Sequence, residues 1–120
     1  MSDSQDQIMK SVAHRLAVVY TGLFTTCENL PIPIALPDGG DAADIKAVVA
    51  RVSQIAEEQP VPEEQQAQLF TAAVMWLAAA DLYSILKMDF LEARADAALG
   101  ILLIARDAVT ALGEWLIEMD

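Results

Sequence analysis

Side chains that commonly carry out chemistry are scarce in this sequence, which has one histidine, His14, and one cysteine, Cys27. A single cysteine excludes an internal disulfide framework and any multi-cysteine metal site. A single histidine excludes the paired Glu-x-x-His motifs of di-iron bundles and the His-Glu-x-x-His motif of zinc proteases. On one helix the two residues would lie roughly 20 Å apart, too far to form a catalytic pair. We therefore expect no catalytic residue, no cofactor and no metal site, and a protein that is not an enzyme.

Positive charge is scarce as well. Lysines and arginines number 7 against 18 aspartates and glutamates, so the net charge is −11. A negative field repels phosphate backbones, and we expect no binding to nucleic acid. The same field favours fast association with a basic protein. The alternative is that the charge only keeps an apolar protein in solution, since hydrophobic residues make up 55% of the chain.

The pattern of apolar runs predicts neither a secretory signal nor a membrane-spanning segment. The first ten residues, MSDSQDQIMK, carry acids and no basic stretch ahead of an apolar run. The uncharged runs 16–27 and 65–80 are shorter than the ~20 predominantly apolar residues that cross a bilayer. We therefore expect a soluble, cytoplasmic protein without membrane contact.

Apolar residues at alternating spacings of three and four are typical of packed helices, and they predict four of them. The predicted helices cover residues 4–28, 41–58, 62–87 and 89–119. We expect Ser4, Asp41 and Asp89 to cap three of these helices and Pro62 to begin the other. The last helix has the longest seam, formed by Leu91, Ala95, Ala98, Leu102, Ala105, Val109, Leu112, Leu116 and Met119.

Three of the five prolines lie in the segment LPIPIALPDGG, residues 30–40, which cannot be helical. Its leucines and isoleucines indicate that it covers apolar surface as it crosses the bundle. The last two helices are separated by only a short break and so form a tight hairpin. The predicted fold is all-α: one domain, residues 1–120, built as a four-helix bundle with a proline-rich crossover between helices one and two and an antiparallel hairpin of helices three and four.

The third and fourth helices are apolar on more than one face, and residues 97–105 carry no charge at all. Such helices need a second surface to bury, and a second copy of the chain related by a two-fold axis would supply it. We therefore predict a homo-oligomer through these two helices. The predicted interface residues are Trp76, Asp81, Leu99, Leu103, Ile104 and Trp115. For Asp81 two placements remain open: an edge of the bundle, or a pair across the interface with Arg94 or Arg106.

Acidic side chains are densest around the connection between the second and third helices, at Glu57, Glu58, Glu63 and Glu64, and we predict that a basic protein partner would bind there. The same acids do not complete the Glu-Glu-x-x-Glu motif of helical nucleotide pyrophosphohydrolases. Residues 13–16, Ala-His-Arg-Leu, resemble the first half of the Ala-His-x-Leu-Lys-Gly motif of histidine phosphotransfer proteins, although alanine and valine replace its lysine and glycine.

The combined pattern favours a small acidic protein that acts by protein–protein contact, in the manner of immunity proteins, antitoxins, inhibitors or chaperones. The alternative is an oligomeric helical protein that senses or sequesters a small molecule in a pocket lined by aromatic residues and Arg94 or Arg106. A metal-dependent nucleotide hydrolase and a histidine phosphotransfer protein rank below both, because their motifs are incomplete.

Overall fold

The structure, a computed structural model, describes residues 2–119 and is all-α. Its helices are α1 (Ser2–Glu28), α2 (Ala42–Ile55), α3 (Glu63–Met88) and α4 (Glu92–Glu118), with a short 3₁₀ helix, η1 (Ala56–Glu58), after α2. The chain forms an elongated four-helix bundle of 50 × 25 × 19 Å, and α3 and α4 form its most extensive helix pair. The predicted fold class is confirmed.

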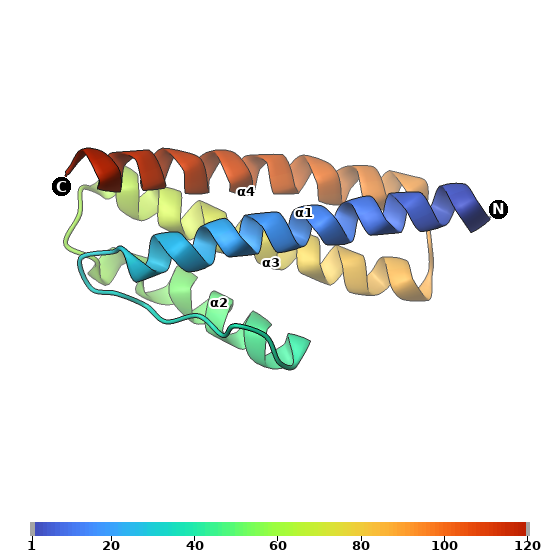
Figure 1. The fold of residues 1–120 in the computed structure, drawn as a ribbon, viewed down its shortest axis with the longest axis horizontal. Coiled ribbons are helices and arrows are strands. Elements are labelled where there is room, and N and C mark those ends of the chain that lie inside the picture. The colour runs from blue at the N-terminus through green and yellow to red at the C-terminus, as the bar shows by residue number, and fades with distance from the viewer. Residues whose placement is uncertain (1, 120) are drawn as a thin grey trace.

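Helix α3 is central to this arrangement, since it contacts each of the other three helices. Helix α1 contacts α3 and α4, so these three helices pack against one another, whereas α2 contacts only α3 and η1. Figure 1 shows that α1, α2 and α4 run in one direction and α3 in the other. Within the described residues, the backbones of α1 and α2 do not approach each other closely, although both pack against α3.

The long seam predicted for the last helix is buried along its middle. Its six central residues are buried, namely Ala95, Ala98, Leu102, Ala105, Val109 and Leu112. The first and last members of the seam, Leu91 and Met119, are exposed because they cap the helix instead of lying within it. The spacing therefore predicted the core face correctly and overran the helix at both ends.

Of the four predicted helix starts, the one at Asp41 is confirmed, and the one at Pro62 differs from the structure by one residue. The Asp41 side chain caps α2 by accepting from the backbone N–H of Ala43 at 2.8 Å. Pro62 stands immediately before α3, with φ −58° and ψ 156°, as its cap and not as its first helical residue. The last three residues of the predicted second helix form η1.

The other two predicted caps are wrong. Helix α1 begins at Ser2, so Ser4 lies inside it. Asp89 ends α3, because its backbone N–H donates to the carbonyl of Ile85 at 2.8 Å, and α4 is capped by Leu91 without a side-chain hydrogen bond. The turn between the two helices is held instead by Arg94, whose Nη1 donates to the Asp89 carbonyl at 2.7 Å.

The proline-rich segment turns back beside α1 and brings the chain to about the middle of the bundle's length, where α2 begins, so α2 runs in the same direction as α1 (Figure 1). Leu30 and Leu36 are buried, in agreement with the prediction that the segment covers apolar surface. The segment ends at Gly39 and Gly40, whose φ values of 113° and 108° lie in a region that other residues rarely adopt.

By length and composition alone, α3 is apolar enough to cross a membrane, although its uncharged run 65–80 is shorter than the ~20 residues expected of such a segment. Core helices of helical bundles have the same property, and α3 is the helix that the other three contact. Only 39% of its most apolar window is buried, however. Part of the apolar surface of α3 therefore remains uncovered within one chain.

Candidate functional site

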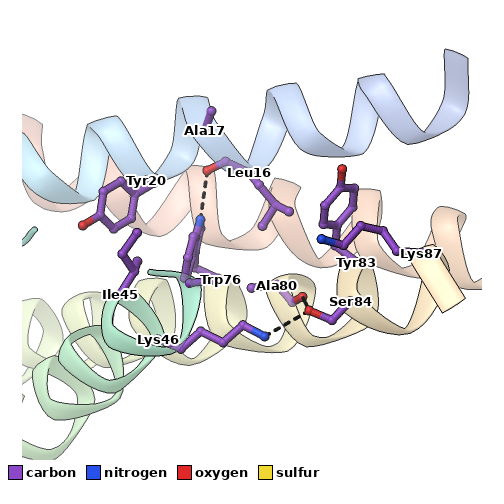
Figure 2. Close-up of a pocket in the computed structure, with 11 residues that line it drawn as sticks. Leu16, Ala17, Tyr20, Ile45, Lys46, Trp76, Ala80, Tyr83, Ser84 and Lys87 are labelled. Carbon is purple, nitrogen blue, oxygen red and sulfur yellow. Dashed lines mark hydrogen bonds between the residues drawn. The ribbon is translucent and has the colours of Figure 1, made fainter. Parts of the chain in front are cut away.

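The gap between α1 and α2 is a groove of about 260 Å³ whose floor is α3 (Figure 2). It exists because three alanines, Ala17, Ala42 and Ala80, one from each helix, face the gap and leave it unfilled. The remaining lining residues are Leu16, Tyr20, Ile45, Lys46, Trp76, Tyr83, Ser84 and Lys87. The lining surface is mostly apolar, and its polar groups come from a few side chains.

An aromatic pair forms one wall of the groove. The Trp76 indole Nε1 donates to the backbone carbonyl of Leu16 at 2.9 Å, which ties α3 to α1. The Tyr20 ring lies 5.3 Å from the Trp76 ring, and its hydroxyl donates to the carbonyl of Pro37. Burial raises the pKa of Tyr20, and the Asp38 carboxylate raises it further, so the hydroxyl keeps its proton and its hydrogen bond. This wall is held in place by contacts on both sides.

Lys46 of α2 and Lys87 of α3 line the part of the groove that lies towards the C-terminal end of α3. The Lys46 ammonium lies 3.1 Å from an Asp81 carboxylate oxygen and donates to Ser84 Oγ at 3.1 Å. The Lys87 ammonium lies 5.2 Å from the centroid of the Tyr83 ring, a cation–π contact. Figure 2 shows Lys46 extended along the groove towards Ser84, with Lys87 beside Tyr83 at its far end. The groove therefore has an apolar part and a cationic part.

A second apolar seam runs along α4, beside the buried one. It consists of Ala97, Ile101, Ile104, Ala108, Ala111 and Trp115, again at spacings of four and three. All six are exposed or only partly buried. At 100° per residue this seam lies on roughly the opposite side of α4 from Leu102, Leu103 and Arg106, which line a hollow against α1. It therefore faces away from α1.

Helix α3 carries a matching seam that one chain covers only in part, formed by Thr71, Met75, Ala78, Leu82 and Ile85, of which Ile85 is exposed and the others are partly buried. These positions lie away from Trp76, Ala80 and Tyr83, which face α1 and the groove. The two seams together make an apolar back face on the α3–α4 pair. We use the term back face for these residues and the six of the second α4 seam.

Gly100 lies beside this back face, in the middle of α4. A glycine inside a helix costs about 1 kcal/mol relative to alanine. A Cβ at Gly100 would meet no atom within 4 Å in this chain, so the fold of one chain does not require a glycine there. A glycine at this position leaves room on the surface of α4.

Only part of the predicted interface lies on the back face. Ile104 and Trp115 do, being exposed and partly buried respectively. Leu103 lines the hollow against α1, and Leu99, one turn before it, lies on the same side. Trp76 is only 7% exposed and packs inside the chain, so it is not available to a second subunit.

Asp81 emerges at the edge of the bundle, the first of its two predicted placements. Its side chain is 67% exposed and pairs with Lys46 of α2. The two arginines considered as its partners pair elsewhere, Arg94 with Asp89 at 3.4 Å and Arg106 with Asp107 at 3.2 Å. The cation that Asp81 attracts was missed because helix spacing does not reveal which helices are neighbours.

The four predicted partner-binding acids all lie on the surface around the η1–α3 connection. Glu57 and Glu63 line one open hollow together with the half-exposed ring of Phe70. Glu58 and Glu64 are exposed beside them in sequence. The structure therefore brings negative charge and an exposed aromatic ring to one place.

His14 and Cys27, the two residues considered for chemistry, lie in different surroundings. His14 is exposed and shares its hollow with Arg15 and Arg106. Cys27 is fully buried at the other end of α1. Within residues 2–119, no three histidine, cysteine or acidic side chains are grouped so that they could hold a metal ion.

Burial raises the pKa of Cys27 to about 12 from 9.0, so its thiolate is about a thousandfold rarer than that of an ordinary cysteine near pH 8. We expect the folded protein to react with a thiol reagent such as DTNB at least ~1000-fold more slowly than the protein in guanidinium chloride.

The Cys27 thiol also holds its proton more tightly in the folded state than in the unfolded state, so the free energy of unfolding should fall as the pH rises from about 9 to about 12. Stopped-flow absorbance and urea unfolding across this pH range test both statements, and rapid labelling of the folded protein would contradict them.

Comparison of the chain with protein-family models, curated proteins and solved structures gave no significant match. Function must therefore be argued from the back face, the groove and the acidic surface themselves.

Proposed function

We propose that this protein is non-enzymatic and acts by protein–protein contact, beginning with a second copy of itself. The observation that carries this proposal is the uncovered second seam of α4, with the matching seam on α3. Helices with two apolar faces are stable when both faces are covered, and the fold of one chain covers only one of them. Soluble proteins rarely leave such a face exposed without a partner.

The back face carries no charged residue, so it can accept a second copy despite the acidity of the chain. The chain carries a net charge of −11, so two copies repel except where the surface lacks acids. The second α4 seam contains no charged residue. If two α4 helices cross antiparallel about Ile104, Gly100 of one lies opposite Ala108 of the other, so small residues meet on both sides of the crossing point. A two-fold axis repeats each of these contacts.

The size of the back face also suits a dimer. A helix of 27 residues is roughly 40 Å long at 1.5 Å per residue. Two such helices side by side, each about 10 Å wide, give the back face an area of roughly 800 Å². Stable interfaces of ordinary size bury about that area on each partner.

Replacing Ile104 with glutamate should convert the dimer to a monomer. The substitution would bury an unpaired carboxylate in each copy, facing its symmetry mate across the axis, and weaken self-association by at least ~100-fold. Sedimentation equilibrium at about 10–100 µM measures this directly. Far-UV circular dichroism should stay unchanged, because the Ile104 side chain is 51% exposed within one chain.

Leu103→Glu is the matched control for Ile104→Glu. Leu103 precedes Ile104 in the sequence, is 42% exposed and faces α1 instead of the back face. Its substitution should leave the dimer intact. Gly100→Gln is a second disrupting variant, because it fits the single chain and obstructs close helix approach. A monomeric wild-type protein at 100 µM would refute the proposal, as would equal effects of Ile104→Glu and Leu103→Glu.

A contact with a basic protein is the second part of this proposal, in the manner of immunity proteins or antitoxins. It is supported by the hollow that Glu57 and Glu63 share with Phe70. An exposed ring surrounded by acids offers both apolar area and charge to a cationic side chain, and the ring face itself attracts cations.

A further inference from the structure

The groove between α1, α2 and α3 has two features that together select a ligand. Its apolar part is bounded by the rigid Trp76–Tyr20 wall and by Leu16, which would contact a hydrocarbon or aromatic body. Its cationic part carries Lys46, Ser84 and Lys87. At about 260 Å³ the space is close to the lower limit of ordinary ligand pockets, so the ligand is small.

The charge at the groove is unusual for this protein. The chain has only three lysines, and two of them, Lys46 and Lys87, line this one groove, while the whole molecule is strongly acidic. Lys46 is already compensated by Asp81. Lys87 has no carboxylate within 4 Å among the described residues and rests on the Tyr83 ring. One unneutralised cation therefore stands at the end of an apolar groove.

We propose that the groove binds a small amphipathic monoanion: an apolar chain or ring that carries a single acid group. The apolar body lies along Trp76 and Leu16, in the space left by Ala17, Ala42 and Ala80. The acid group lies between the Lys87 ammonium and the Ser84 hydroxyl, which can donate a hydrogen bond to it when it turns from the Ala80 carbonyl that it now contacts at 3.2 Å. Medium-chain fatty acids and aryl carboxylates share this chemistry.

Lys46 orients this site. Its ammonium donates to Ser84 Oγ, so the hydroxyl proton, which now goes to the Ala80 carbonyl, can turn towards an anion without the loss of the Lys46 contact. Because Asp81 neutralises Lys46 on the outer side, the net attraction at the groove comes mainly from Lys87. A dianion would find only one uncompensated cation, and for this reason the geometry favours a single negative charge.

The test uses the intact protein with decanoate, indole-3-acetate and two matched probes, decan-1-ol and decylammonium. Calorimetric titration should give a dissociation constant of roughly 0.1–1 mM for the better of the two acids, as expected for a ligand of about a dozen heavy atoms. The two acids distinguish chain from ring as the apolar body. Decanol should bind more weakly, and decylammonium more weakly still.

Lys87→Gln should weaken binding of the acid about fivefold and leave decanol unchanged, because an exposed ion pair is lost. Lys10→Gln, which removes the lysine outside the groove, is its control and should have no effect. Ala17→Phe should abolish binding by filling the groove from the exposed face of α1, whereas Val18→Phe, at the neighbouring residue that faces α4, should not.

Three results would overturn this inference. One is that neither acid binds at millimolar concentration. Another is that decanol and decanoate bind equally and Lys87→Gln changes neither. The third is that Ala17→Phe, with unchanged circular dichroism, binds the acid as well as the wild type, since the site would then lie elsewhere.

Discussion

Replacing Trp76 with alanine should destabilise the protein by about 3–5 kcal/mol, the usual range for removing a large buried aromatic side chain. Trp76 stands where α1 and α3 meet, packs on Tyr20 and donates to the Leu16 carbonyl at 2.9 Å. The variant loses the packing area and the tie between helices together. Urea unfolding followed by circular dichroism should show this loss, and the melting temperature should fall by roughly 10–20 °C.

Two control variants separate the contributions to this effect. Trp76→Phe keeps most of the ring and loses the hydrogen bond, so it should cost about 1–2 kcal/mol. Trp115→Ala removes the other tryptophan, which is only partly buried on α4, and should cost less than Trp76→Ala when measured on dilute protein. Equal losses from Trp76→Ala and Trp115→Ala would mean that the indole of Trp76 is not a core element.

The helices could be predicted because heptad spacing is a local property of the chain. Ala98 and Leu102 are apolar neighbours on one face in any long helix, whatever surrounds it, and both are buried as the spacing indicates. Helix ends are less predictable. Asp89 has the chemistry of an N-cap, but the three-residue connection between α3 and α4 uses it to end the earlier helix.

The groove could not be predicted, because it arises from a contact that is absent. The spacing of Ile45 and Val48 marks α2 as an amphipathic helix, and nothing in that spacing shows that α2 packs on α3 alone. Lys46 lies off the apolar stripe of α2, at a position typical of a solvated residue. Its partners, Asp81 and Ser84, follow it by more than thirty residues in the sequence, and only the tertiary structure brings them together.

The interface residues were predicted by composition, and this is why they scattered over different faces. Leu103 and Ile104 are consecutive in the sequence, yet 100° of rotation turns them to different sides of α4. Trp76 and Ala78 differ by two positions, yet one is buried against α1 and the other lies on the partly covered seam. Separating the two seams by phase would have assigned Ile104 and Trp115 to one face from the sequence alone.

A second large effect is expected at Gln59, a buried polar residue that the sequence did not single out. Its side-chain amide makes two hydrogen bonds with the backbone of Ile32, in the way that one strand pairs with another. Nε2 donates to the Ile32 carbonyl at 2.7 Å, and Oε1 accepts from the Ile32 N–H at 3.1 Å. Since prolines on both sides of Ile32 supply no N–H, this pair is the main polar attachment of that part of the crossover.

Gln59→Met should therefore cost about 2–3 kcal/mol, because it keeps the volume and removes two hydrogen bonds from a residue that is 3% exposed. The loss should be local, with the Ile32 amide exchanging its hydrogen much faster while amides in α4 respond only to the global change. Gln66→Ala is the matched control, since Gln66 also donates to two carbonyls, those of Glu57 and Gln59, each at 3.0 Å, but does not touch the crossover. Hydrogen exchange followed by NMR distinguishes the two variants. If the Ile32 amide is as protected in Gln59→Met as in Gln66→Ala, the crossover is held by the burial of Leu30 and Leu36, and the amide pair is incidental.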